Sequence, residues 1–410
     1  MLLVQKFGGS SVATLDHMER VAEKIRSVRA AGDQVVVVVS AMGDRTDELV
    51  NLATEANPAM PAREMDVLMA TGEVQSTAIL AMVLQRIGIA AQSFTGREAG
   101  ILTDSHHRRA RILAIDPIRL RAALAGGITP VVAGFQGVDE SGAVTTLGRG
   151  GSDLTAIALA GALKADRCEI YSDVAGVFTA DPRIVPTAVP LDHLSYDEMV
   201  ELASQGAQVL QTRAVEYART NQVVIHARST FVDDAPGTLI VEKNQDNPPV
   251  TAVALASKVA KIGLVGVPDA PGVAAHLFSR LAEHGIDVDL VIQSLSHEKL
   301  NDIAFTVHLD DLPQAEPIAR EVLAELKGST LIVDTDIAKV SAVGSGMLGR
   351  PGVAARVFQA LADAGVNIQM IGTSEIKISC IVAAADAKRS LLAIHEAFGL
   401  APLNSEALSP

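Results

Sequence analysis

The 410-residue sequence contains no tryptophan, and aromatic residues make up only 3% of it. A chain this poor in aromatic side chains offers no row of rings on which the bases of single-stranded nucleic acid could stack. Positive charge is also scarce, because the formal net charge is −14 at pH 7. We therefore expect no nucleic-acid partner, although a few arginines can still form a local anion site. The core must be mainly aliphatic.

Cysteine is nearly absent too. Cys168 and Cys380 lie far apart, each in an apolar run, which is typical of reduced core thiols in a cytosolic protein rather than of a disulfide. No apolar stretch reaches the roughly 18 residues that span a bilayer, and the N-terminal residues lack the regions of a signal peptide. We expect a cytoplasmic protein of two or three domains with no membrane partner.

Strand-like and helix-like segments alternate from residue 1 to about residue 235. The expected strands are Leu2–Phe7, Gln34–Ala41, Ile128–Phe135 and Cys168–Ser172, and the expected helices include Leu15–Ala30, Arg63–Ile87 and Leu154–Leu163. Such alternation predicts an α/β fold with a mainly parallel sheet sandwiched by helices.

A polar stretch at Glu242–Pro249 marks a linker, and an internal repeat follows it. Residues 261–292 and 339–371 each contain a strand, the sequence Pro-Gly-Val-Ala-Ala and a helix with matching glycines. The pattern predicts a ferredoxin-like βαββαβ module, present twice. Because a strand at Thr251–Ala256 is surplus to the first module, we predict that the first is inserted within the second. The predicted domains are 1–245, 261–335, and 250–258 plus 336–410.

The loop Thr145–Asp153 is the most informative segment. Its three glycines allow close backbone approach to a ligand, and Ser152 and Asp153 are residue types that cap a helix N-terminus, where anions are favoured. Arg149 adds a guanidinium fork that suits a carboxylate or a phosphate. The residues alone leave a second interpretation open, a glycine-rich connector capped by Ser152.

Three further polar segments follow strands. The turn at 6–11, Lys-Phe-Gly-Gly-Ser-Ser, suits a phosphate beside a lysine, and the loop at 40–47 follows the carboxyl end of a strand, where ligands bind in open α/β sheets. Ser172 and Asp173 lead into a nucleotide-type loop at 174–183. Each could instead be a plain turn or surface loop, and Glu73, a lone acid in an apolar helix, could be solvated. His106 and His107 have no metal-ligand spacing and look structural.

Taken together and in this order, the motifs resemble the aspartate kinases of the amino-acid kinase family, followed by tandem ACT regulatory domains. The motifs are Lys-Phe-Gly-Gly-Ser-Ser at 6–11, Ser-Ala-Met-Gly-Asp at 40–44, Gly-Glu at 72–73, Ser-Phe-Thr-Gly at 93–96, Thr-Thr-Leu-Gly-Arg-Gly-Gly-Ser-Asp at 145–153, Ser-Asp-Val at 172–174 and Thr-Ala-Asp-Pro-Arg at 179–183. The resemblance implies ATP-dependent phosphorylation of the β-carboxylate of L-aspartate to 4-phospho-L-aspartate. That reaction begins lysine, methionine and threonine biosynthesis.

The resemblance also implies roles for individual residues, with substrate-bound Mg²⁺ and no protein metal site. Lys6 and Asp153 would be catalytic. Aspartate would be bound by Ser40, Thr46, Glu73, Arg149, Gly150, Gly151 and Ser152. ATP would be bound by Lys6, Phe7, Gly8, Gly9, Ser172, Asp173, Phe178, Thr179, Ala180, Asp181, Pro182 and Arg183. An effector amino acid, threonine or lysine or both, would be bound by Asp269, Gly272, Ala274, Asp287, Val288, Asp289, Gln293, Asn367, Ile368, Thr373 and Ser374.

The sequence departs from the family pattern in ways that bear on catalysis and control. Gln208 stands where the family usually has a lysine near the ATP phosphates, and Arg213 or Arg183 could replace that cation. Ala354 and Arg356 replace residues that hold lysine in lysine-inhibited relatives, so we expect weak lysine inhibition. A kinase for another acidic amino acid, or a non-catalytic ACT sensor, remains an alternative. The ACT modules imply a homo-oligomer or pairing with a short ACT-only subunit.

Overall fold

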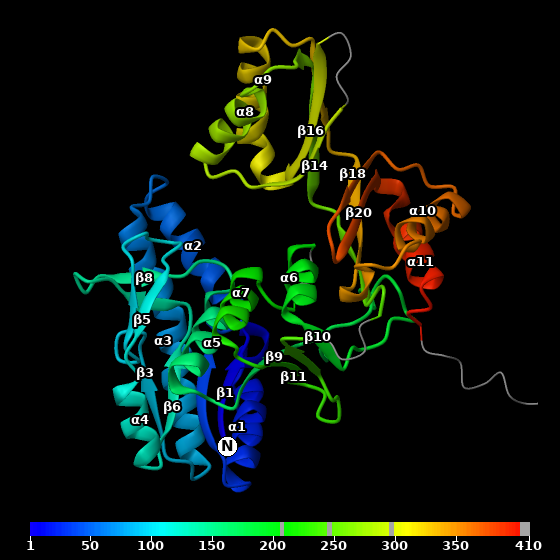
Figure 1. Cartoon of the computed structure of the whole chain (residues 1–410). Helices are drawn as coiled ribbons and strands as arrows, with labels where there is room; N and C mark the ends of the chain where they lie inside the picture. The colour runs from blue at the N-terminus through cyan, green and yellow to red at the C-terminus, as the bar shows by residue number, and fades with distance from the viewer. Residues whose placement is uncertain (206–208, 244–247, 295–298, 402–410) are drawn as a thin grey trace, which may run out of the picture. The chain divides into compact units, whose positions relative to one another are not determined.

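The computed structural model describes residues 1–205, 209–243, 248–294 and 299–401, which divide into two compact units (Figure 1). The first unit contains residues 1–177, 190–204 and 209–243 of the described chain. The second contains residues 178–189, 205 and 248–401.

Within the described residues, the first unit is built on an eight-stranded sheet. Its strand order is β10 (His193–Ser195), β12 (Thr238–Val241), β11 (Ile225–Ser229), β9 (Arg167–Ser172), β1 (Leu2–Phe7), β2 (Gln34–Val39), β6 (Thr129–Ala133) and β3 (Ala91–Phe94). Neighbouring strands are parallel except β11 and β12. The prediction of a mainly parallel sheet is thereby confirmed. The five valines of β2 are fully buried, as a strand covered on both faces requires.

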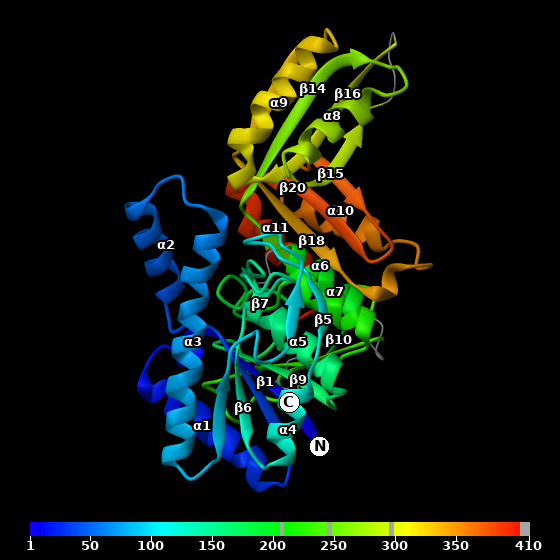
Figure 2. The same ribbon diagram turned by 90° about the vertical axis from the view of Figure 1, so that its left-hand side faces the viewer.

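Helices cover both faces of this sheet (Figure 2). On one face lie α1 (Leu15–Ala30) and α3 (Ala62–Arg86), whose apolar side chains join Phe7 and the β2 valines in one core cluster. The buried residues of α1 recur every three or four positions, which makes one apolar stripe. On the other face lie α4 (Ile118–Ala125) and α5 (Gly151–Leu163), and α5 is buried along most of its length.

Helix α3 corrects one expectation. It is 25 residues long, with an 18-residue window of mean hydropathy 1.6, so by length and composition alone it could cross a membrane. The prediction that no apolar stretch is this long was wrong, because alanine, valine and methionine dominate the helix between few charges. In the fold, 56% of that window is buried, and α3 packs against β3 and β6 as a core helix.

Sequence patterns missed a second, smaller sheet in this unit. Its order is β5 (Ile112–Ile115), β4 (Ile101–Thr103), β7 (Gln136–Val138) and β8 (Val144–Thr146). Strands of three or four residues are too short to show an alternating pattern. The helix α2 (Arg45–Ala56) was also missed, since the loop expected at 40–47 already becomes helical at Arg45. Two more helices, α6 (Tyr196–Ser204) and α7 (Thr212–Asn221), complete the unit.

The second unit contains two four-stranded antiparallel sheets, each with two helices. One sheet has the order β15 (Val288–Gln293), β16 (Leu300–His308), β14 (Val259–Pro268) and β17 (Thr330–Asp334), with α8 (Val273–Glu283) and α9 (Leu312–Glu325). The other has the order β13 (Ala252–Ala256), β18 (Ile337–Val343), β20 (Lys377–Ala383) and β19 (Met370–Thr373), with α10 (Val353–Asp363) and α11 (Ala387–Ala397). Strand β13, which precedes the first module in sequence, therefore pairs with a strand of the second.

Residues 178–189 belong to the second unit although the chain on either side of them belongs to the first. Ala180 and Val185 are buried in the core cluster around β18, α10 and α11. Thr179 accepts a hydrogen bond from the Val253 N–H at 2.8 Å, and its hydroxyl lies 3.0 Å from His395 Nε2. This segment is held by buried packing as well as by its hydrogen bonds.

Candidate functional site

A cavity of about 1220 Å³ opens in the first unit beside the carboxyl ends of β1 and β2. Polar loops meet there because the carboxyl ends of parallel strands lie at the same edge of a sheet. Residues predicted to be catalytic or to bind substrate all line this one cavity: Lys6, Ser40, Thr46, Glu73, Arg149, Gly150, Gly151, Ser152 and Asp153.

An ion pair lies in the buried part of the cavity. Lys6 Nζ is 2.6 Å from Asp153 Oδ1, and the two side chains are only 11% and 10% exposed. Lys6 comes from the end of β1 and Asp153 from the first turn of α5. Water screens charges poorly in such a setting, so Lys6 is a strong local cation whose position is fixed by Asp153.

Glu73 is 3% exposed and projects from α3 into the same cavity. Its Oε1 accepts a hydrogen bond from the Ala41 N–H at 3.2 Å, whereas Oε2 has no hydrogen-bond partner among the described residues. Burial raises the pKa of this carboxyl from 4.5 to about 7, because the charged form loses water. Glu73 is therefore not a solvated surface residue, and its free oxygen faces a place for a ligand.

Two loops that follow β1 and β2 meet at Gly9. The Gly43 N–H donates to the Gly9 carbonyl at 3.1 Å. A Cβ at Gly9 would lie 3.0 Å from the Ala41 carbonyl oxygen and 3.2 Å from that of Gly43, so a side chain there would push the two loops slightly apart. The contact joins the turn after Lys6 to the segment that carries Ser40 and, at the start of α2, Thr46.

Gly150 forms the entry to α5. Its φ is +69°, and a Cβ there would lie 2.0 Å from Gln211 Cγ, so both backbone conformation and space require glycine. Gly150 is also the N-cap residue of α5, without a side-chain capping bond. The prediction that Ser152 or Asp153 caps this helix was wrong. Both lie in its first turn, which leaves their side chains free to face the cavity.

The rim of the cavity carries arginines that sequence reasoning largely missed. Arg108 and Arg109 line it beside the predicted Arg149, all three are exposed, and no ion pair within the described residues involves them. Arg213, named earlier as a substitute cation, also lines the cavity, and its Nη1 donates to the Leu147 carbonyl at 3.1 Å. In the sequence, His106 and His107 were considered only as metal ligands, and the arginines that follow them were given no role.

Other predicted ATP-site residues lie elsewhere. Of the phosphate-turn residues only Lys6 and Gly9 line the cavity. The ring of Phe7 stacks on Tyr171 at 4.8 Å in the core cluster that includes α1 and α3, and the Gly8 N–H already donates to the Tyr171 carbonyl. Phe178, Thr179, Ala180, Asp181, Pro182 and Arg183 belong to the second unit, where Arg183 pairs with Asp181 at 2.7 Å. Gln208 lies outside the described residues.

Predicted effector residues gather at helix starts and strand ends of the second unit. Gly272 is the N-cap of α8 with a φ of +96°, and Gly352 has the same role at α10 with +95°. Asn301 Nδ2 donates to Asp269 at 2.9 Å, and Asp289 is already paired with the buried Lys339. The repeat seen in sequence is therefore also a repeat of backbone conformation.

No cluster of three or more histidine, cysteine, aspartate or glutamate side chains with the geometry of a metal site occurs in the described part of the chain. The cavity does, however, carry the Asp153 carboxylate, whose Oδ1 is paired with Lys6. Mg²⁺ binds proteins through one or two carboxylates together with phosphate oxygens of the substrate, and this arrangement fits that mode.

Comparison with known proteins identifies the parts of the chain. Residues 1–228 match the amino acid kinase family, and residues 264–326 and 340–398 each match the ACT domain. The chain is 49% identical to an aspartokinase of Mycolicibacterium smegmatis over 97% of this chain and 96% of the relative. It is 48% identical to an aspartokinase of Thermus thermophilus over 97% of this chain and 99% of the relative. A crystal structure of Escherichia coli aspartokinase III with aspartate and ADP has a TM-score of 0.83 at 28% identity, covering 97% of this chain and 99% of that one.

Proposed function

The chain belongs to the amino acid kinase family as an aspartokinase with two ACT domains, and from this premise we propose how its residues bind and phosphorylate L-aspartate. The reaction transfers the γ-phosphoryl group of ATP to the β-carboxylate of aspartate, giving 4-phospho-L-aspartate and ADP. The observation that carries the assignment of residues is that one cavity brings together the Lys6–Asp153 pair, Glu73 and Arg149.

We propose that Glu73 and Arg149 fix the orientation of aspartate. The unpartnered Oε2 of Glu73 suits the substrate ammonium, because an ammonium group supplies both the proton donors and the charge that this buried oxygen lacks. Arg149 is exposed at the rim and suits a carboxylate, to which a guanidinium donates two parallel hydrogen bonds. Ser40, Thr46 and Ser152 supply hydroxyls around the same space.

In the transfer step a β-carboxylate oxygen attacks the γ-phosphorus while the bond to the ADP oxygen breaks. The attacking carboxylate is already ionised near neutral pH, so no general base is needed. The obstacle is repulsion between two anions, and catalysis consists mainly of positioning and of offsetting charge on the moving group. Lys6 supplies that charge, and Asp153 holds its ammonium in place at 2.6 Å.

We infer that ATP enters as its magnesium complex, with Asp153 as the carboxylate nearest the phosphates. Magnesium neutralises phosphate charge when bound. Gly9 and the start of α5 lie where backbone N–H groups can approach phosphate oxygens. The nucleotide base remains assigned to Ser172, Asp173 and residues 178–183 as a prediction.

The test is a hydroxamate assay, in which the acyl phosphate reacts with hydroxylamine. We expect magnesium-dependent hydroxamate formation from L-aspartate and ATP, and none from L-glutamate at equal concentration. Hydroxamate formed from glutamate instead would indicate a kinase for a different acidic amino acid. The absence of any turnover dependent on Lys6 would indicate a non-catalytic amino-acid sensor.

The ACT domains make the enzyme allosterically regulated, and we propose threonine as the effector that they retain. Arg356 lies in the first turn of α10, with its guanidinium carbon 4.8 Å from the centre of the Phe398 ring. A cation there repels the side-chain ammonium of lysine, so lysine inhibition should be weak. Inhibition by threonine and lysine, alone and together, tests the proposal, and strong inhibition by lysine alone would contradict it.

We further propose a cytoplasmic enzyme that assembles through its ACT domains, as a homo-oligomer or with a short ACT-only subunit. Both cysteines are free and buried, which supports a reducing compartment.

A further inference from the structure

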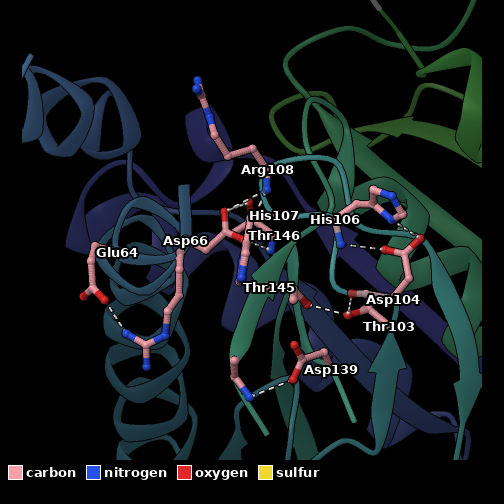
Figure 3. Close-up of polar contacts among 12 residues, drawn as sticks. Glu64, Asp66, Thr103, Asp104, His106, His107, Arg108, Asp139, Thr145 and Thr146 are labelled. Carbon is pink, nitrogen blue, oxygen red and sulfur yellow. Dashed lines mark hydrogen bonds and ion pairs between the residues drawn. The ribbon is translucent and has the colours of Figure 1, made fainter. Parts of the chain in front are cut away.

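Asp66 is fully buried on α3, and its carboxylate accepts hydrogen bonds from two separate segments of the cavity wall. Figure 3 shows these donors around the Asp66 carboxylate, with the Arg108 side chain pointing away from it. None of the functions considered above uses Asp66.

The first segment is the loop of His107 and Arg108. His107 Nδ1 lies 2.7 Å from Asp66 Oδ2, and the Arg108 N–H lies 3.0 and 3.1 Å from the two carboxylate oxygens. Arg108 has a φ of +68°, a conformation that is uncommon for a residue with a side chain. Such strained residues persist where their surroundings over-determine them, and here Asp66 binds the strained peptide directly.

The second segment is the end of β8, which leads into the Arg149 loop. Asp66 accepts from the Thr146 N–H at 3.1 Å and from its hydroxyl at 2.6 Å. The two segments also contact each other: the Ala110 N–H donates to the Thr146 carbonyl at 2.9 Å. At Gly148, a Cβ would lie 2.9 Å from the Arg108 carbonyl oxygen. One buried carboxylate therefore joins the two backbone segments that carry the arginines of the rim.

We propose that Asp66 is a positioning residue for aspartate binding, and that Arg108 is a further binding residue for a carboxylate of the substrate. Asp66 sets the backbone from which Arg108 and Arg109 reach the rim, and through Thr146 it sets the start of the Arg149 loop. This inference rests on the proposed function, since it takes the rim as the place where aspartate binds.

The chemistry of the pocket favours this role over packing alone. The cavity lining contains five cations, from Lys6, Arg108, Arg109, Arg149 and Arg213, against the carboxylates of Asp47, Glu73 and Asp153. A chain with a net charge of −14 concentrates positive charge here, which suits a substrate with two carboxylates. Asp66 is not among the residues that line the cavity, and in the described structure it forms no ion pair with the arginines that do.

The first test is Asp66→Asn in the full-length enzyme. The amide keeps the shape but loses one acceptor oxygen, so some donors of the two loops lose their partner. We expect the KM for L-aspartate to rise by about tenfold or more, with the KM for ATP and kcat changed by less than about threefold. A purely structural role predicts instead a lower melting temperature and a lower active fraction, with both KM values unchanged. That result would overturn the proposal.

His107 offers a matched pair of variants. In His107→Asn the amide nitrogen takes the place of Nδ1 and still donates to Asp66, whereas His107→Leu cannot donate. We expect the KM for aspartate to stay near the wild-type value in His107→Asn and to rise in His107→Leu. Equal KM values in these two variants would show that donation to Asp66 does not set binding.

Arg108→Gly distinguishes the role of the Arg108 side chain from that of its backbone N–H, which donates to Asp66. Glycine accepts a φ of +68° without strain, so this variant should be at least as stable as the wild type while its KM for aspartate rises about tenfold. An unchanged KM would remove Arg108 from the binding site. Wild-type hydroxamate formation is measured first, so that a failure of the proposed function is seen before these variants are compared.

Discussion

The floor and the rim of the cavity are built in opposite ways. Lys6, Asp153 and Glu73 form the floor, where the whole residues are between 3% and 9% exposed and are held by a 2.6 Å ion pair or a backbone hydrogen bond. Arg108 and Arg149 on the rim are exposed and form no ion pair within the described chain. The floor is thus largely organised by the protein itself, and the rim is left for a ligand to complete.

This contrast corresponds to two functions, stabilisation of the transition state and binding of the substrate. Charges that act on a transition state have to be fixed before the substrate arrives, because reorganising them during reaction would cost energy. Side chains that grip the substrate can remain free, since their ordering is part of binding. Substitutions of the ion pair in the floor should therefore change kcat and stability together, and substitution of the buried Glu73 should change KM and stability. Substitutions on the rim should change KM alone.

The largest effect should come from Lys6→Met. Removing the cation should lower kcat by about a thousandfold and leave Asp153 as an uncompensated buried charge, which lowers the free energy of unfolding by about 3 kcal/mol. Steady-state kinetics and urea unfolding measure the two effects. In the double variant Lys6→Met with Asp153→Asn, stability should return and kcat should not. A Lys6→Met enzyme with wild-type kcat would break the contrast.

Glu73→Gln should move binding and stability in opposite directions. Losing the ammonium partner should raise the KM for aspartate by about a hundredfold. Stability should rise at pH 8, because the folded-state pKa of Glu73 is raised to about 7 and its burial as an anion costs about 3 kcal/mol above that pH. The stability that protonated Glu73 contributes is fully present below the unfolded-state pKa near 4.5 and is lost as pH rises through 7. The free energies of unfolding of the wild type and of Glu73→Gln should therefore converge near pH 5.

The same carboxyl gives the wild type a pH signature. As pH falls through 7, Glu73 takes up a proton and loses its attraction for the substrate ammonium, so the KM for aspartate should rise. In Glu73→Gln that rise between pH 8 and pH 6 should be absent. An identical pH profile of KM in both enzymes would assign the ammonium to another group.

Arg149→Lys tests the rim. A lysine keeps the charge but cannot form the paired hydrogen bonds of a guanidinium, so the KM for aspartate should rise about thirtyfold. The melting temperature should stay within about 1 °C of the wild type, because Arg149 is exposed and without an ion-pair partner. A clear loss of stability would place Arg149 in the floor rather than the rim.

The smallest effect is expected in the second unit, at Arg356→Glu. This change replaces a repulsive charge with an attractive one for a lysine side chain, so the lysine concentration for half-inhibition should fall by about fivefold. Activity without added amino acids should not change, because Arg356 is not in the cavity. Inhibition curves for lysine and threonine measure the effect, and an unchanged lysine curve would contradict the assignment.

Sequence reasoning recovered the four central strands of the main sheet, β9, β1, β2 and β6, and the residues of the cavity floor, because both depend on local pattern. Consecutive valines mark β2, Lys6 lies at the end of β1, Ser40 directly follows β2, and Glu73 interrupts an apolar helix. It could not find Asp66, whose four hydrogen-bond donors belong to residues about 40 and 80 positions away. Nor could it find the left-handed conformation of Arg108, which depends on that distant carboxylate rather than on the residue type.

The prediction of the residue that caps α5 was wrong for a related reason. Serine and aspartate are good caps in isolation, but Gly150 takes that position because Gln211 fills the space where a side chain would be. The sequence correctly placed residues 150–153 at the cavity. Which of them caps the helix through its backbone, and which point side chains into the cavity, depends on the contact between Gly150 and Gln211.

The path of residues 178–189 also bears on how the enzyme can be divided. The linker at 242–249 suggests that cutting there would release an intact kinase. Ala180 and Val185, however, are buried against Val253, Val340 and Leu391, all of which lie beyond such a cut. A kinase fragment that ends at the linker would therefore expose the apolar side chains of residues 178–189, in the middle of its sequence, once the second unit is removed.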